Sequence, residues 1–249
     1  MNLNKVLIQI KKHDFTKELK DFEYETKFDI VNSGLSDLSV LKRIEGCFDD
    51  NRRFILVKVK RGDKLVTHVS FFTLGNVEYS LFKYRGARMV KIKKHKMIKG
   101  FPFFIFKNYE QLVVDKNDFS KIKDLHYRFQ KHNYLLVDLD KFLKQKSSLV
   151  YRGEMIKNRV KGFVFDVSNG KIYAIAVAFC KSRGRIQKQF EIEYSGYLPN
   201  FKKSGKNIEK QIVAGVQELS GYIYDNFPDI LKPSTERKFE FVKKLNTKI

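Results

Sequence analysis

Two glutamates and a lysine alternate in the segment Glu23-Tyr24-Glu25-Thr26-Lys27, close to the start of this 249-residue chain. In an extended strand, alternate side chains point to the same face, so the three charges share one face and their mostly aromatic neighbours share the other. Two carboxylates about 7 Å apart along a strand can hold a hard divalent cation, and the lysine can meet an anion that the cation carries. The simpler interpretation is a solvated strand, because alternation alone indicates only half-burial.

Other segments with the character of strands also carry like charges two residues apart. The basic sets are Lys58 and Lys60; Lys83 and Arg85; Lys91 and Lys93; and Lys157, Arg159 and Lys161, and the acidic set is Glu191 and Glu193. Each basic pair alone is compatible with ordinary lysines on an edge strand. Together the basic faces would repel one another unless they converge on an anion, and the acidic pairs could neutralise the metal that such an anion brings. Closing the strands into a barrel would place these faces inside.

The overall charge supports an anionic partner. The chain has 50 lysines and arginines against 28 aspartates and glutamates, a formal net charge of +22. Nucleic acid, polyphosphate, nucleotides and anionic membrane are all compatible with this surplus, and a lysine-rich composition can also reflect genome bias. A hydrophobic fraction of 43%, with 23 phenylalanines and 12 tyrosines, excludes a disordered chain and provides for a sizeable core.

The cysteine content and the apolar runs predict an intracellular, cytoplasmic and soluble protein. Cys47 and Cys180 are too few for a disulfide framework or a four-cysteine zinc site. No targeting segment is visible, and the apolar run from Ile172 to Cys180 is about half the length of a membrane helix, so we expect no membrane partner. The five histidines show no paired ligand spacing, and they are expected at the surface or in the core. The sequence leaves the oligomeric state open.

The periodicity predicts mostly strands. We expect them over residues 54–60, 65–73, 78–84, 89–93, 149–152, 155–166, 171–180 and 187–194, with a hairpin turn at 168–170. A short helix is expected around residues 35–44, capped by Ser36 or Ser33, and a long helix from Asn207 to Pro228. Residues 107–148 look helical, like an insertion between two strand-rich halves, and residues 229–249 look like a basic tail. The predicted fold class is α+β, mainly antiparallel β, in a single domain of residues 1–249.

The order of these motifs resembles that of the triphosphate tunnel metalloenzymes, or CYTH superfamily, from residue 22 to about residue 227. This superfamily includes inorganic and thiamine triphosphatases, class IV adenylate cyclases and metal-dependent RNA 5′-triphosphatases. The segment from Glu23 to Lys27 has the family's Glu-x-Glu-x-Lys form. Phe82-Lys83-Tyr84-Arg85 looks like its Leu-Arg-x-Arg strand, Lys91 and Lys93 like the following lysine strand, Lys157-Asn158-Arg159 with Asp166 like its Lys-x-Arg and Asp elements, and Glu191-Ile192-Glu193 like its closing Glu-x-Glu strand.

The resemblance implies an eight-stranded closed tunnel with flanking helices, in which acidic residues bind one or two Mg²⁺ or Mn²⁺ ions and basic residues hold phosphates. The implied metal ligands are Glu23, Glu25, Glu191 and Glu193. Lys27, Arg85 and Arg159 would act in catalysis with the first two of these, and Lys58, Lys60, Lys83, Lys91, Lys93, Lys157 and Lys161 would bind phosphate. The expected activity is metal-dependent hydrolysis of the terminal phosphoanhydride of RNA 5′-triphosphate, a nucleoside triphosphate or tripolyphosphate. The excess positive charge mildly favours a triphosphate-bearing polyanion such as RNA.

Three alternatives remain open. Glu25-Thr26-Lys27 also has the acidic-x-Lys form of metal-dependent nucleases, with Asp14 or Asp21 as the further carboxylate, but this leaves Glu191 and Glu193 unexplained. A non-catalytic binder of RNA or polyphosphate would use the basic strands and the aromatic residues, and would need no acidic pairs. Adenylate cyclase activity is compatible with the same architecture.

Overall fold

The computed structural model describes residues 3–12, 14–31, 34–57, 65–84, 86–98, 103–121, 133–199, 201 and 207–247. The helices are α1 (Leu3–Lys11), α2 (Asp37–Gly46), α4 (Leu139–Lys144), α5 (Ile208–Asn226) and α6 (Lys238–Asn246). The strands are β1 (Phe22–Ile30), β2 (Phe54–Val57), β3 (Leu65–Leu74), β4 (Val77–Tyr84), β5 (Ala87–Ile98), β6 (Ile105–Asp115), β7 (Tyr134–Val137), β8 (Val150–Asp166), β9 (Lys171–Ser182), β10 (Arg185–Tyr197) and β11 (Leu231–Pro233). Lys58, Lys60 and Arg85 lie outside the described residues.

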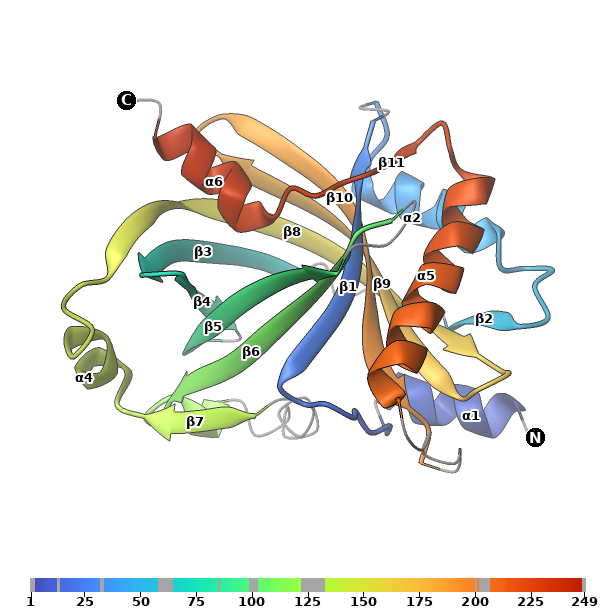
Figure 1. The fold of residues 1–249 in the computed structure, drawn as a ribbon, viewed down its shortest axis with the longest axis horizontal. Coiled ribbons are helices and arrows are strands. Elements are labelled where there is room, and N and C mark those ends of the chain that lie inside the picture. Colours follow the sequence, from blue (N-terminus) through green and yellow to red (C-terminus); the bar gives the residue numbers. More distant parts are fainter. Residues whose placement is uncertain are drawn as a thin grey trace.

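Eight antiparallel strands close into a barrel (Figure 1). The order around the barrel is β1-β10-β9-β8-β3-β4-β5-β6, and β6 pairs with β1 to close it. Strands β2, β7 and β11 extend the sheet by pairing with β8, β6 and β1. The fold expected from the motif order, a mainly antiparallel closed barrel with flanking helices, is therefore confirmed.

The main hydrophobic core lies outside one wall of the barrel, under α2 and α5. Tyr24 and Phe28 of β1 are fully buried there with Val216 and Leu219 of α5, because the apolar positions of α5 recur at helical spacing. The hydroxyl groups of Thr26 and Ser220 are hydrogen-bonded across this contact at 2.7 Å. Figure 1 shows α5 running along the outside of the sheet beside β1 and β9. The outward residues of β1 are therefore the apolar ones, and its charged residues face inward.

Small side chains on β9 leave room inside the barrel. Ala176 lies directly opposite Glu191 of β10 on one side and Lys161 of β8 on the other. Ala174 and Ala178 occupy the equivalent positions two residues away along the strand, and all three alanines are fully buried. Because directly opposed residues share a face of the sheet, the long charged side chains of β8 and β10 can extend over these alanines into the interior.

The expectation of a helical insertion over residues 107–148 is wrong for most of the described part. Residues 105–115 form β6, which pairs with both β5 and β1 and so closes the barrel. Residues 134–137 form β7, and α4 covers only residues 139–144. The charged residues of this region suggested a helical insertion, but β6 also contains the buried apolar run Leu112, Val113 and Val114, and its pairing with strands on both sides decides the conformation.

The C-terminal region is a packed part of the fold. Leu231–Pro233 forms β11 against β1, and α6 packs against β8 through buried Phe239 and Val242. The expectation of a basic tail was wrong here because two apolar side chains three residues apart seat the helix on the barrel.

None of the helices in the described ranges is long and apolar enough to cross a membrane.

A bulge in β10 depends on Gly196. Its φ of +141° is rarely adopted by other residues, and a Cβ added there would lie 2.0 Å from the carbonyl oxygen of Thr16. We expect Gly196→Ala to lower the free energy of unfolding by about 1–3 kcal/mol or more, because the strained φ and the clash with the carbonyl oxygen of Thr16 both destabilise the folded state. The control is Gly46→Ala, where nothing lies within 4 Å and φ is ordinary, so stability should stay unchanged or rise slightly. Urea unfolding followed by circular dichroism measures both, and equal midpoints for the two variants would contradict this account of the bulge.

Candidate active site inside the barrel

The barrel encloses a cavity of about 380 Å³ that is lined by charged side chains. Nine lysines and arginines contribute to its lining: Lys17, Lys27, Lys91, Lys93, Lys157, Arg159, Lys161, Arg237 and Lys238. Six glutamates also contribute: Glu23, Glu25, Glu78, Glu110, Glu191 and Glu193. Among the described residues, the lining thus has three more basic than acidic side chains, an imbalance that favours an anionic ligand.

Ten of the predicted site residues line this single cavity. They are Glu23, Glu25, Lys27, Lys91, Lys93, Lys157, Arg159, Lys161, Glu191 and Glu193. The prediction for Lys83 is wrong, because its side chain is exposed and the inward positions of β4 are Glu78, Ser80 and Phe82. Asp166 also lies elsewhere, since its buried carboxylate accepts hydrogen bonds from Arg53 and Ser168 at the β8–β9 hairpin.

Lys27 joins the two acidic strands. Its Nζ lies 2.9 Å from Oε2 of Glu25 and 2.8 Å from Oε1 of Glu191, its cross-strand neighbour on β10. Burial alone would lower the pKa of Lys27, but the carboxylates of Glu191 and Glu25 raise it above its ordinary value. Burial would likewise raise the pKa of Glu191, yet Lys238 and Lys27 hold it well below its usual range. Lys238 also donates a hydrogen bond to Glu191, so α6 closes part of the site.

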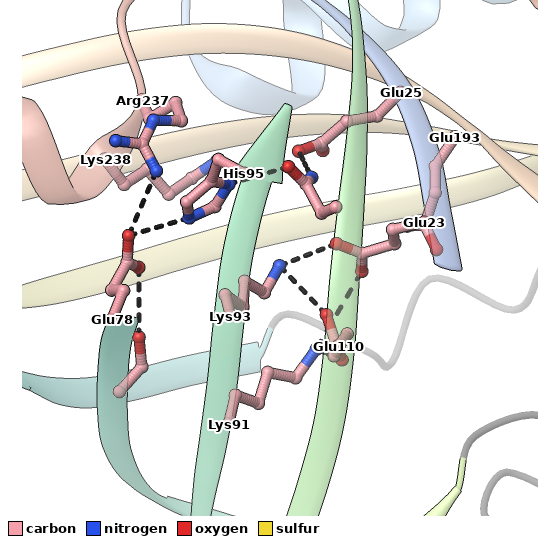
Figure 2. A network of polar contacts seen from close by, with 12 residues as sticks. Glu23, Glu25, Glu78, Lys91, Lys93, His95, Glu110, Glu193, Arg237 and Lys238 are labelled. Carbon is pink, nitrogen blue, oxygen red and sulfur yellow. Dashed lines mark hydrogen bonds and ion pairs between the residues drawn. The ribbon is translucent and has the colours of Figure 1, made fainter. Parts of the chain in front are cut away.

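A second charged group brings together β1, β5 and β6 (Figure 2). Lys93 Nζ lies 2.6 Å from Oε2 of Glu23 and 2.9 Å from Oε2 of Glu110, and Lys91 Nζ lies 2.5 Å from Oε1 of Glu110. Burial would raise the pKa of Glu23, but Lys93 and Lys91 hold it well below its usual range. Both lysines have raised pKa values, because Glu110 and Glu23 outweigh the effect of burial. Lys91 and Lys93 are therefore ammonium ions, and Glu23 is an ionised carboxylate.

The interior also contains one lysine that titrates near neutrality. Burial, followed by repulsion from Lys238 and Arg159, lowers the pKa of Lys157 to about 7. Arg159 keeps its charge, since Glu191 and Glu193 at 3.9 and 3.6 Å from Nη2 more than offset burial and raise its pKa. Lys157 is thus a side chain whose charge can respond to the ligand in the cavity.

The acidic residues provide oxygen donors of the kind that Mg²⁺ and Mn²⁺ prefer. Glu25 and Glu193 are direct cross-strand neighbours on the inner face, and Glu23 and Glu191 line the same cavity. Among the described residues, however, no three His, Cys, Asp or Glu side chains are gathered as one ligand set. Lys27 lies between Glu25 and Glu191 and takes up oxygens that an ion would use. The chemistry of the donors fits a hard divalent cation, while their present partners are ammonium groups.

Sequence reasoning missed several residues of the cavity. Glu78 shares a predicted strand with Lys83 but lies on its opposite face, so choosing the basic face of β4 excluded it. Glu110 was missed because residues 107–148 were expected to be helical. Asn108, Glu110 and Leu112 are buried at alternate positions, a strand pattern that could have identified it. Arg237 and Lys238 carry no local signal, because only the docking of α6 brings them to the barrel.

His95 of β5 is another missed residue, and it contacts side chains of the two neighbouring strands (Figure 2). Its Nε2 lies 2.9 Å from Oε2 of Glu78, and its Nδ1 lies 2.6 Å from Oδ1 of Asn108. Asn108 in turn donates from Nδ2 to Oε1 of Glu25 at 2.9 Å. Arg237 donates to the same Glu78 oxygen at 3.2 Å.

Comparisons with known proteins find only solved structures of low identity and TM-scores below 0.5. No protein-family model matches the chain. No curated protein matches it significantly. Among solved structures, a candidate adenylate cyclase from Bacillus halodurans is 12% identical with a TM-score of 0.45, covering 89% of this chain and 98% of the other. A conserved hypothetical protein from Pyrococcus furiosus is 10% identical with a TM-score of 0.42, covering 88% and 98%.

An RNA triphosphatase of S. pombe, in complex with the Spt5 CTD, is 10% identical with a TM-score of 0.39, covering 94% of this chain and 95% of the other. The strand order of this chain, and not the size of these similarities, identifies its fold as a closed eight-stranded barrel.

Proposed function

We propose that this chain is a metal-dependent triphosphatase that acts inside the barrel. The observation that carries the proposal is the single cavity in which Glu23 and Glu25 of β1 meet Glu191 and Glu193 of β10, surrounded by an excess of lysines and arginines. Binding an uncharged ligand would not require so many inward charges, and each of them costs free energy to desolvate unless it is paired.

Phosphate binding is assigned to the basic residues. Arg159 can grip phosphate oxygens through two donors, while Lys91, Lys93 and Lys161 act as point charges. In hydrolysis, a water oxygen forms a bond to the terminal phosphorus as the bond to the bridging oxygen breaks, and the negative charge on the leaving group grows. Fixed positive charges in a partly dry cavity stabilise that charge without needing to reorganise.

The acidic residues are assigned to the metal and the water. Glu25 and Glu193, with Glu23 and Glu191, would hold Mg²⁺ or Mn²⁺, which when bound neutralises phosphate charge and polarises the reacting group. Carboxylates that are not occupied by the ion can orient the attacking water. Since metal and cations supply the catalysis, no serine, cysteine or histidine nucleophile is required.

One wall of the cavity favours a substrate with an organic group. Met89, Phe82, Val69 and Met155 are successive cross-strand neighbours on β5, β4, β3 and β8, and all four line the cavity. They form an apolar row beside the charged strands. A nucleoside triphosphate or the 5′-triphosphate end of RNA has an anionic part and an apolar, planar part, whereas tripolyphosphate has only the first. This contrast supports an organic triphosphate as the substrate.

The first test is phosphate release with Mg²⁺ or Mn²⁺ from tripolyphosphate, ATP and triphosphate-ended RNA. We expect metal-dependent release, and a fall in kcat of at least about 100-fold for both Glu23→Gln and Glu191→Gln, since each removes charge at the reacting centre. Glu154→Gln is the matched control, because this glutamate is exposed on β8 and does not line the cavity. ATP cyclisation is scored in the ATP reaction from the appearance of cyclic AMP together with pyrophosphate.

Retained turnover in either glutamate variant would contradict a shared site. Binding of RNA or tripolyphosphate without any release, and undiminished by the two substitutions, would instead support the non-catalytic binder. Cleavage of RNA or DNA within the chain that depends on Glu25 but not on Glu191 would support the nuclease.

The pKa of Lys157 generates a prediction about pH. Because its folded pKa is lowered to about 7, Lys157 gains a proton as the pH falls below 7, and the cavity becomes more positive. We expect tripolyphosphate to bind more tightly at pH 6 than at pH 8, beyond the change caused by the ligand's own protonation. Calorimetry in two buffers of different ionisation enthalpy should show proton uptake on binding near pH 7.5, since an anion favours the charged lysine.

Lys157→Met is the matched variant, and it should remove this proton uptake and flatten the pH dependence. Lys83→Met, which changes an exposed lysine on the outer face of β4, should behave as wild type. Equal proton uptake in wild type and Lys157→Met would show that another group titrates.

A further inference from the structure

The side chains of Glu78, His95, Asn108 and Glu25 form one hydrogen-bonded chain across four strands. It runs from β4 through β5 and β6 to β1, with links of 2.9, 2.6 and 2.9 Å. Asn108 is fully buried, Glu78 is 7% exposed and Glu25 is 9% exposed. The side chain of His95 is 18% exposed and lines the cavity. Because Asn108 is fully buried and its neighbours are largely so, an unmatched donor or acceptor in this chain would cost free energy.

The donor and acceptor roles are determined by the carboxylates at the two ends. Lys27 Nζ lies 2.9 Å from Oε2 of Glu25, and Arg237 donates to Oε2 of Glu78, so the carboxylate oxygens at both ends face cationic donors and act as acceptors. Asn108 must therefore turn its NH₂ group toward Glu25, which leaves its Oδ1 facing Nδ1 of His95. Turning the amide over would place two acceptor oxygens against each other.

His95 then faces an acceptor at each ring nitrogen. Nδ1 faces the amide oxygen of Asn108, and Nε2 faces the carboxylate oxygen of Glu78. A neutral imidazole has one donor and one acceptor nitrogen, so either neutral tautomer would set a lone pair against an oxygen. Both links are satisfied only if both nitrogens carry protons. Two carboxylates, of Glu78 and Glu240, and one guanidinium, of Arg237, surround the ring, so a positive charge on His95 would balance these neighbours.

We propose that His95 is a doubly protonated positioning residue that orients Glu25 through Asn108. The imidazolium holds the oxygen of Asn108, which fixes the plane of the amide, and the amide NH₂ then holds one oxygen of Glu25. The other oxygen of Glu25 is left for Lys27 and for a ligand in the cavity. The effect of His95 on metal binding rests on the proposed function, whereas its protonation state and its hold on Asn108 do not.

The first measurement is the protonation state of His95 in the uniformly ¹⁵N-labelled wild-type protein at pH 7. Long-range ¹H–¹⁵N correlation of the imidazole ring distinguishes two protonated nitrogens from either neutral tautomer. We expect His95 to show two protonated nitrogens. A bare nitrogen at either position overturns the proposal, whether or not the protein is an active enzyme.

The second measurement tests positioning through the affinity for Mn²⁺, followed by electron paramagnetic resonance without substrate. Loss of groups that orient a metal ligand typically weakens metal binding by about 10–100-fold, and we expect this for His95→Gln and for Asn108→Leu. Asn108→Asp should weaken it at least as much, because it replaces the donor toward Glu25 by an acceptor. His68→Gln is the matched control, since this histidine is exposed on β3.

The outcomes separate the two proposals. If wild type and His68→Gln bind Mn²⁺ alike while all three network variants bind weakly with unchanged melting temperatures, positioning is supported. If wild type binds no Mn²⁺, the proposed function fails, and the ring spectrum still decides the state of His95. If Mn²⁺ binds equally to wild type and to a folded Asn108→Asp variant, His95 does not position Glu25 and the inference is overturned.

Discussion

Charge compensation inside the barrel is the constraint on which the rest of the structure depends. Lys27 illustrates it, since a buried ammonium group lies within 3 Å of two carboxylates that come from strands more than 160 residues apart. Removing two such charges from water costs several kcal/mol per ion, and only close partners recover that cost. The interior charges therefore have to be matched in position, and a register shift of one residue in β1 or β10 would turn that strand's inward charges toward the apolar layer outside.

The apolar layer outside the barrel contributes stability that offsets the free-energy cost of the buried charges. The largest hydrophobic cluster lies on the outer wall, where β1, β9 and β10 pack against α2 and α5, so much of the apolar burial is made outside the barrel interior. The interior is then available for polar side chains, and the alanines of β9 keep it wide enough for them. The charged cavity and the main apolar layer thus lie on opposite faces of the same strands.

Three of the interior acid–base groups differ in the neighbours that set their charge. Lys238 and Lys27 hold Glu191 in the ionised state, and Glu191 and Glu25 hold Lys27 in the charged state, whereas Lys157 has repulsive neighbours and is poised near neutrality. The network through His95 adds a rigid polar connection between β4 and β1 that contains an amide and two carboxylates. Together these groups line the cavity with a surplus of positive charge and with carboxylate oxygens, one of which accepts a hydrogen bond from Asn108.

The amino-acid sequence by itself determined which face of each strand is charged. The period of two in β1, β5, β8 and β10 is a local property, so Glu23, Lys91, Arg159 and Glu191 could be assigned to one kind of face before any pairing was known. The same reasoning placed Lys83 wrongly, because its strand carries Glu78 on one face and Lys83 on the other, and the spacing of Lys83 and Arg85 favoured the basic face. Only the tertiary structure decided which face lies inside, because closure of β6 onto β1 and the docking of α6 depend on contacts between residues far apart in the chain. For that reason Glu110, Arg237 and the partners of His95 appeared only once the barrel was closed.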